Sequence, residues 1–159
     1  MKIRFKLNNK TVEIEAGADE RLVDVLRREF GLMSMKKNCM QGICGSCIIL
    51  LDNNPVPACM LPVFAVAEKN IITLEAFSTT PEYTEIISAF EKEGITLCGF
   101  CSSGAVLTAH SLLKKQWNPT DDQIRNAYIG ITCRCIDIVS ITAALKQIGR
   151  SKRSKRHDK

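Results

Sequence analysis

The sequence predicts an α+β fold in two parts, a small mixed domain over residues 1–75 and an all-helical domain over residues 76–149. Two observations lead to this prediction. Apolar residues alternate with polar ones near the amino terminus, and past Phe77 the apolar period becomes helical and stays helical. Because the chain has 159 residues, neither part can bury a large core of its own.

The first domain opens with a predicted β-hairpin, in which alternating apolar residues flank the turn Asn8-Asn9. A helix is expected next, with Asp19 as its amino-terminal cap and Gly31 at its carboxyl end. Two further strands are expected at Ile48–Leu51 and at residues 71–74, and the first of them ends in a predicted turn at residues 52–55.

Four helices are predicted in the second domain. Their start signals are, in order, the segment 78–81, Ser102 or Ser103, the capping box of Thr120 and Gln123, and Asp137. Gly94 is expected to stop the first of them.

Net charge separates residues 150–159 from the rest of the chain. This segment holds six basic residues and one acidic residue, which leaves 16 of each sign in residues 1–149. Its composition predicts a disordered tail, and because no aromatic platform or recognition motif accompanies it, a nucleic-acid role is not favoured. Charges also interrupt the amino terminus, so neither a signal peptide nor a membrane span is expected, and we predict a cytoplasmic protein.

Eight cysteines are the most informative feature of the sequence. In a cytoplasmic chain, thiols stay reduced and serve metal binding or catalysis more often than disulfides. The cysteines form two groups of four, namely Cys39, Cys44, Cys47 and Cys59, and then Cys98, Cys101, Cys133 and Cys135. The second group precedes the second and fourth predicted helices, so pairing of those helix starts would bring four thiolates together near positive dipole ends.

Four thiolates can hold either zinc or an iron-sulfur cluster, so the spacing has to distinguish them. Cys-x4-Cys-x2-Cys with a distant fourth cysteine is the plant-type spacing for a [2Fe-2S] cluster, whereas structural zinc sites use short Cys-x2-Cys pairs. The spacing therefore favours [2Fe-2S], and a structural zinc protein is the alternative hypothesis.

Residues beside the predicted ligands fit an anionic cluster. Gly42 and Gly45 permit unusual dihedrals and close backbone approach, and backbone N–H groups on that path can point at the sulfurs. Arg134 lies between the last two cysteines, where its cation would ease electron uptake. Lys36 and Lys37 precede the first cysteine and either act in the same way or form a solvated loop face.

These motifs resemble those of a known family. Cys39-x-x-Gly42-x-Cys44-Gly45-x-Cys47, Cys-Gly-Phe-Cys at 98–101 and Cys-Arg-Cys at 133–135 are similar to the motifs of the two-cluster iron-sulfur subunit of molybdenum hydroxylases. That family includes xanthine dehydrogenase, aldehyde oxidoreductase and carbon monoxide dehydrogenase. The likeness covers about residues 1 to 148 and includes all eight cysteines in order.

The resemblance implies a plant-ferredoxin-like β-grasp domain followed by a four-helix domain, each binding one [2Fe-2S] cluster through its four cysteines. It also implies a large partner subunit with a molybdopterin cofactor and a medium partner subunit with FAD. Electrons would enter through the cluster of the helical domain and leave through the other cluster to the flavin. The chain would be an electron-transfer subunit of an oxidoreductase without a catalytic residue or substrate site. Xanthine or a related purine is the default substrate of the whole enzyme, with aldehydes, other N-heterocycles and carbon monoxide as alternatives.

The chain departs from the family around the second group of cysteines. Leu97 stands where the family usually has a glutamine that reaches the pterin. The other departures are Ser102-Ser103 for Thr-Pro, Ile131-Thr132 for Asn-Leu, and Ile136-Asp137 for Thr-Gly. We expect the cluster to persist because its ligands are intact, and we expect Leu97, Ile131 and Ile136 to form one apolar patch matched to an altered partner.

Overall fold

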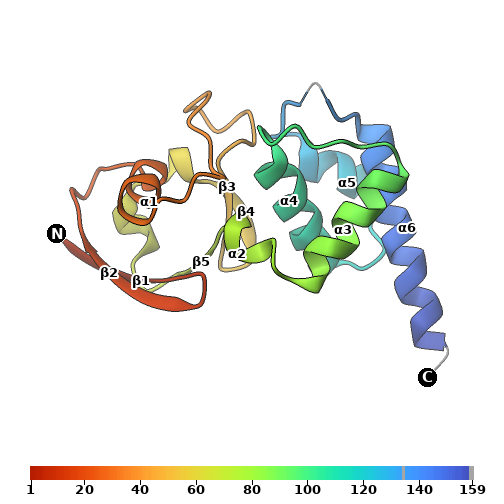
Figure 1. Ribbon diagram of the computed structural model, residues 1–159, viewed down its shortest axis with the longest axis horizontal. Helices are drawn as coiled ribbons and strands as arrows, with labels where there is room; N and C mark the ends of the chain where they lie inside the picture. The colour runs from red at the N-terminus through yellow and green to blue at the C-terminus, as the bar shows by residue number, and fades with distance from the viewer. Residues whose placement is uncertain (134, 158–159) are drawn as a thin grey trace.

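The computed structural model describes the backbone of residues 1–133 and 135–157 and the side chains of residues 1–133 and 135–151. A sheet half and a helical half lie side by side along the long axis of the molecule (Figure 1). This arrangement is the α+β fold that the sequence predicts. Every helix in the described ranges is too short or too polar to cross a bilayer.

One mixed sheet of five strands forms the first half, in the order β2-β1-β5-β3-β4. The predicted hairpin is confirmed, because β1 (Lys2–Leu7) pairs antiparallel with β2 (Lys10–Glu15) across a turn in which Asn8 and Asn9 have φ of 51° and 69°. On its other side β1 runs parallel to β5 (Asn70–Ile72), and β5 pairs antiparallel with β3 (Ile48–Leu51).

Helix α1 (Leu22–Phe30) covers the sheet and ends as predicted at Gly31, whose φ of 62° is left-handed. The prediction that Asp19 caps its start is wrong. The N-cap residue is Arg21, and the first helical N–H, that of Leu22, donates to the backbone carbonyl of Leu61 at 2.8 Å. A backbone partner from another segment therefore replaces the expected side-chain cap.

The strands around residues 52–74 differ from prediction in two places. The turn is shorter than expected, since β4 (Asn54–Pro57) begins directly after it and pairs with β3. At the other end, β5 stops at Ile72, and the short helix α2 (Leu74–Phe77) replaces the predicted last strand residue. The side chain of Asn8 explains this stop, because it exchanges two hydrogen bonds with Thr73 in place of a strand partner.

Strand β3 belongs to both hydrophobic cores. Ile49 is packed in the core of the sheet half, while Ile48 and Leu50, which point to the opposite face, are packed in the core of the helical half. A strand with both faces buried has a continuous apolar sequence, as this one does. The residue that precedes β3 is Cys47, so the same strand also positions one of the predicted ligands.

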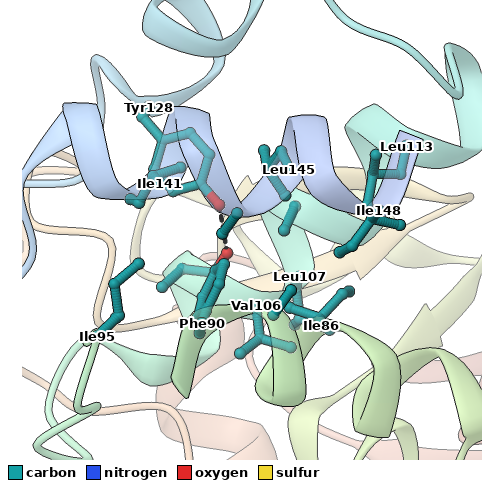
Figure 2. Packing of buried hydrophobic residues seen from close by; sticks show 14 of the residues in the cluster. Ile86, Phe90, Ile95, Val106, Leu107, Leu113, Tyr128, Ile141, Leu145 and Ile148 are labelled. Carbon is teal, nitrogen blue, oxygen red and sulfur yellow. Dashed lines mark hydrogen bonds between the residues drawn. The ribbon is translucent and has the colours of Figure 1, made fainter. Parts of the chain in front are cut away.

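The four predicted helices of the second half are confirmed as α3 (Pro81–Lys92), α4 (Ser102–Lys115), α5 (Asp121–Tyr128) and α6 (Ile138–His157). The capping box of Thr120 and Gln123 is present, and the Asp137 carboxylate accepts the N–H of Ser140 at 2.9 Å. Figure 2 shows the buried side chains between these helices, with the Tyr128 hydroxyl donating to the carbonyl of Ala105 at 2.7 Å.

Helix α6 continues past residue 149, where the sequence predicts the end of the folded domain. Its backbone stays helical to His157, whereas the composition predicts a disordered tail from residue 150. Arg, Lys and Ser follow Gly149 without a further glycine or any proline, so the sequence offers the helix no local stop signal.

Candidate iron-sulfur sites

The first set of cysteines lies in the long loop before strands β3 and β4 and in the short helix after them. Cys39 and Cys44 are in the loop after α1, and Cys47 ends that loop just before β3. Cys59 lies in a short 3₁₀ helix, Ala58–Met60, directly after β4. Pairing of β3 with β4 brings the last two together, because the N–H of Ala58 donates to the carbonyl of Cys47 at 3.0 Å.

The thiols of this set form two neighbouring pairs. Besides the N–H of Gln41, the neighbouring Cys44 side chain shifts the pKa of the Cys39 thiol. Besides burial, the neighbouring Cys59 side chain shifts the pKa of the Cys47 thiol. Cys44 also acts on Cys47 through its charge, so the two pairs adjoin one another. The structure thus places these cysteines as two pairs, Cys39 with Cys44 and Cys47 with Cys59.

The second set lies at two helix starts, as predicted. Cys101 is the residue before α4, and Cys133 and Cys135 lie in the segment that leads into α6. The Cys101 and Cys133 sulfurs are 2.9 Å apart, and, after the N–H of Phe100, the neighbouring Cys135 side chain helps to lower the pKa of Cys98. This set is also made of two pairs. All eight cysteines are free thiols.

Backbone N–H groups point at sulfurs in both sets, as the sequence argument expects. The N–H of Gln41 donates to the Cys39 sulfur at 3.4 Å, and the N–H of Cys135 donates to the Cys133 sulfur at 3.4 Å. The Gln41 N–H is the main reason that the pKa of the Cys39 thiol falls to about 6. In the same way, the N–H of Phe100 lowers the pKa of Cys98. These donors stabilise thiolates, the form that binds metal.

Other thiols of each set are buried and resist ionisation. Burial raises the pKa of Cys47 to about 12 and that of Cys101 to about 12. A buried thiolate needs a compensating positive charge, and a bound metal supplies it while displacing the proton. Each set therefore combines a thiol favoured as thiolate with a buried thiol that needs a cation.

The glycines between the first cysteines have the conformation that the sequence argument expects. Gly42 and Gly45 each have a φ of 75°. A Cβ on Gly42 would also lie 2.8 Å from the Cγ of Met60, so any other residue here would have to displace that side chain in addition to adopting a left-handed φ. Gly99 has a φ of 81° and was overlooked, although its place between Cys98 and Cys101 repeats the same signal.

Ser46 is a further residue of the first site that the sequence argument missed. Its side chain is fully buried in the loop between Gly45 and Cys47, and its hydroxyl has no hydrogen-bond partner among the described residues. A buried donor without a partner is costly unless an acceptor fills the space beside it. The sulfur atoms of a [2Fe-2S] cluster are acceptors of this kind, so the donor set of this loop fits the group.

The basic residues that the sequence associates with the clusters have other contacts or lie outside the described part. The Lys37 ammonium pairs with the Asp24 carboxylate, and the Lys36 ammonium donates to the carbonyl of Met33 at 2.9 Å. These contacts favour the interpretation of the two lysines as a loop face. Arg134 lies outside the described residues, and its role stays a prediction.

The apolar residues among the departures from the family pattern line two hollows. Ile131 and Ile136 line one hollow beside Cys133, whereas Leu97 lines a different hollow together with Gly99. All three pack partly against the core of the helical half. The three residues thus share the core of the helical half but line different hollows, and a single apolar patch matched to a partner stays a prediction.

Comparison with known proteins agrees with these two sites. The family described as "2Fe-2S iron-sulfur cluster binding domain" matches residues 5–69, and the family described as "[2Fe-2S] binding domain" matches residues 73–146. Both descriptions name the [2Fe-2S] cluster, in agreement with the plant-type spacing and against the zinc alternative. The chain binds two [2Fe-2S] clusters.

Individual relatives cover almost the whole chain. The nicotinate dehydrogenase small FeS subunit of Eubacterium barkeri is 36% identical over 144 residues, which are 91% of this chain and 92% of the relative. The structure of quinoline 2-oxidoreductase from Pseudomonas putida 86 superposes with a TM-score of 0.85 at 30% identity, covering 98% of this chain and 96% of that chain.

A third relative carries the same unit inside a longer chain. The aldehyde oxidoreductase of Desulfovibrio desulfuricans superposes with a TM-score of 0.84 at 27% identity, covering 97% of this chain but 17% of that chain. Together with the two cysteine sets and the two-part fold, these likenesses establish that the chain belongs to the family of two-cluster [2Fe-2S] small subunits of molybdenum hydroxylases.

Proposed function

We propose that the chain relays electrons in a molybdenum hydroxylase through the eight cysteines as cluster ligands. The observation that carries this proposal is the arrangement of eight free thiols in two sets, each made of two neighbouring pairs. Each iron of a [2Fe-2S] cluster takes two protein ligands besides the bridging sulfides, so two pairs match two irons. When bound, each cluster takes up and passes on one electron.

The pairs divide the ligands of each cluster. In the first site, Cys39 and Cys44 would hold one iron and Cys47 and Cys59 the other. In the second site, one pair is Cys98 with Cys135, and the other is Cys101 with Cys133. This assignment is supported by the backbone N–H groups that donate to the sulfurs of Cys39, Cys98 and Cys133. Such hydrogen bonds stabilise the thiolate form and would ease electron uptake by a bound cluster.

Exposure of the thiols supports an assignment of partners to the two ends of the molecule. Cys98 and Cys135 are exposed, and Phe100 beside them exposes 47% of its surface. This edge would face the molybdopterin subunit. At the other site Cys39 is partly exposed, and Met60, which follows Cys59, exposes 54%. This second edge would face the FAD subunit, and the chain itself would bind no substrate.

The substrate of the whole enzyme is proposed to be an N-heteroaromatic compound. Two of the three relatives compared above are named for nicotinate and quinoline, which are both aromatic compounds that contain nitrogen, and the third is named for aldehydes. Xanthine, the default expectation from the family, belongs to the same chemical class. The cytoplasm is the proposed location, because eight free thiols fit a reducing compartment.

Co-purification tests the partners. The tagged full chain, purified anaerobically from its own host, should bring with it one subunit that contains molybdopterin and one that contains FAD. Phe100→Glu should lose the molybdopterin subunit, because the substitution places a charge at the proposed docking edge. Phe64→Glu is the matched control, since Phe64 exposes 52% and lies in another element, the 3₁₀ helix Val63–Val66. Retention of molybdenum by Phe100→Glu would refute this docking edge.

A further inference from the structure

The two cluster-binding segments contact each other directly, although they belong to different halves of the chain. The Thr132 hydroxyl donates to the carbonyl of Ile43 at 2.9 Å. Thr132 precedes Cys133 of the second site, and Ile43 precedes Cys44 of the first site. A single hydrogen bond thus joins the residue before a ligand of one cluster to the residue before a ligand of the other.

We infer that Thr132 is a positioning residue that couples the two clusters for electron transfer. The inference rests on the proposed function, because it takes Cys133 and Cys44 as ligands. From the Cys133 sulfur to the Cys44 sulfur, a covalent route is interrupted by nothing but the hydrogen bond from Thr132 to Ile43. One electron passes from one cluster to the other, so one is oxidised and the other reduced, and no bond breaks and no proton moves.

Packing beside Thr132 holds this hydrogen bond in place. A Cβ built on Gly45 would lie 3.0 Å from the Cγ1 and Cγ2 atoms of Ile131, so the Ile131 side chain rests directly on the backbone of the first loop. The N–H of Ile131 donates in turn to the carbonyl of Tyr128 at 3.0 Å, which ties the segment to α5. Ile131, the residue before Thr132, is therefore held by the loop of the first site and by the end of α5.

A second hydrogen bond, from α4 to the loop of the first site, makes a longer route and serves as an internal control. The Ser103 hydroxyl donates to the carbonyl of Ser46 at 3.1 Å. Ser103 is separated from Cys101 by Ser102, whereas Thr132 is adjacent to Cys133. The carbonyl of Ser46 also accepts the N–H of Lys36 at 2.8 Å, so loss of the Ser103 hydroxyl leaves this acceptor paired. Ser103 is therefore expected to contribute to packing and little to the coupling.

Thr132 lies at one of the positions where the chain departs from the motif of the family that it resembles. The family usually has leucine at the position of Thr132, and leucine has no donor for the Ile43 carbonyl. The hydroxyl is therefore an addition to the common framework, and the position tolerates an apolar residue within the same fold. Substitutions at Thr132 should accordingly retain both clusters.

The test compares Thr132→Val and Thr132→Leu, which lack the donor, with Thr132→Ser, which keeps it, and with Ser103→Ala. The full chain carrying both clusters is reduced partially by a radiolytic pulse, and the rate of electron redistribution between clusters is followed. The spin–spin splitting of the fully reduced protein is recorded by electron paramagnetic resonance. We expect Thr132→Val and Thr132→Leu to slow redistribution severalfold and to reduce the splitting, and we expect Thr132→Ser and Ser103→Ala to match the parent chain.

Two results would overturn the inference. The first is an unchanged redistribution rate and spin–spin splitting in Thr132→Val and Thr132→Leu. The second is an equal decrease of the rate and the splitting in Ser103→Ala, which would show that packing alone sets the coupling. Failure of the proposed function looks different. In that case the parent chain itself would lack the two cluster signals before any substitution is compared.

Discussion

The carbonyl oxygen of Gly45 lies so close to Gly104 that a Cβ built on Gly104 would be 2.4 Å from that oxygen. Gly45 belongs to the loop of the first cluster site, and Gly104 to the first turn of α4, which begins directly after Cys101 of the second site. Both residues are buried. The halves of the molecule therefore meet backbone to backbone between the two sites.

This contact predicts a large effect for Gly104→Ala. In an isolated helix the substitution would stabilise by about 0.8–1.0 kcal/mol. Here the added methyl group meets a backbone atom, which cannot move aside as a side chain can, so we expect a net loss of about 1–3 kcal/mol in the free energy of unfolding. Denaturant unfolding of the full chain measures it.

Gly130→Ala is the matched control for this prediction. A Cβ on Gly130 has no neighbour within 4 Å. The free energy of unfolding of Gly130→Ala should therefore differ from that of the parent chain by no more than about 0.5 kcal/mol. Equal stability of the two variants would show that the halves do not meet as closely as the structure has them.

Ser46→Ala should lower the reduction potential of the first cluster. Hydrogen bonds to cluster sulfurs raise the potential, and the buried Ser46 hydroxyl has no other partner among the described residues. The potential of the second cluster is an internal reference in the same redox titration, because its ligand segments do not contain Ser46. A downward shift of both potentials, or of neither, would contradict the role given to this hydroxyl.

The Glu75 carboxylate should account for part of the stability that the fold loses in acid. Burial raises the pKa of this carboxyl, but the N–H of Ser34 at 2.8 Å and the Ser34 hydroxyl at 2.7 Å outweigh it, and the net pKa is lowered. A carboxyl with a lowered pKa in the folded state contributes stability above its unfolded pKa, and this contribution is lost as the pH falls through the folded value.

Glu75→Gln should therefore be less stable than the parent chain at about pH 7, and the difference should shrink toward about pH 3. Urea unfolding across this range measures it, with the exposed Glu91 replaced by glutamine as the control. A stability difference for Glu75→Gln that stays constant with pH would show that the carboxylate charge does not matter.

Much of this fold is predictable from local signals. Helix starts such as the capping box of Thr120 and Gln123 depend on residues a few positions apart, and the turn at Asn8-Asn9 needs left-handed residues that asparagine supplies. The cysteine spacing likewise places two thiols on one short segment, as at Cys98 and Cys101. These features need no knowledge of the tertiary structure.

Features that depend on distant partners were missed. The start of α1 is satisfied by the carbonyl of Leu61 rather than by Asp19, and β5 ends where the side chain of Asn8 takes over from a strand. The contact from Thr132 to Ile43 joins residues 89 positions apart. No local sequence pattern indicates such distant pairs. For this reason the sequence predicts a partner surface at the departures from the family, and it does not predict that Thr132 joins the two cluster sites.

Cys44→Ser tests the assignment of ligands. The two sets share no residue, so this substitution should remove or alter the signal of the first cluster in electron paramagnetic resonance and spare that of the second. Cys101→Ser should have the opposite effect. Loss of both signals in either variant would indicate that the clusters cannot be held independently, and loss of neither would exclude that cysteine as a ligand.

The metal and sulfide content of the anaerobically purified full chain tests the central claim most directly. Eight thiols in two sets of two pairs predict two [2Fe-2S] clusters, and hence about four irons and four acid-labile sulfides per chain. Stoichiometric zinc without sulfide would contradict the account, because four thiolates around a single ion need no bridging sulfide.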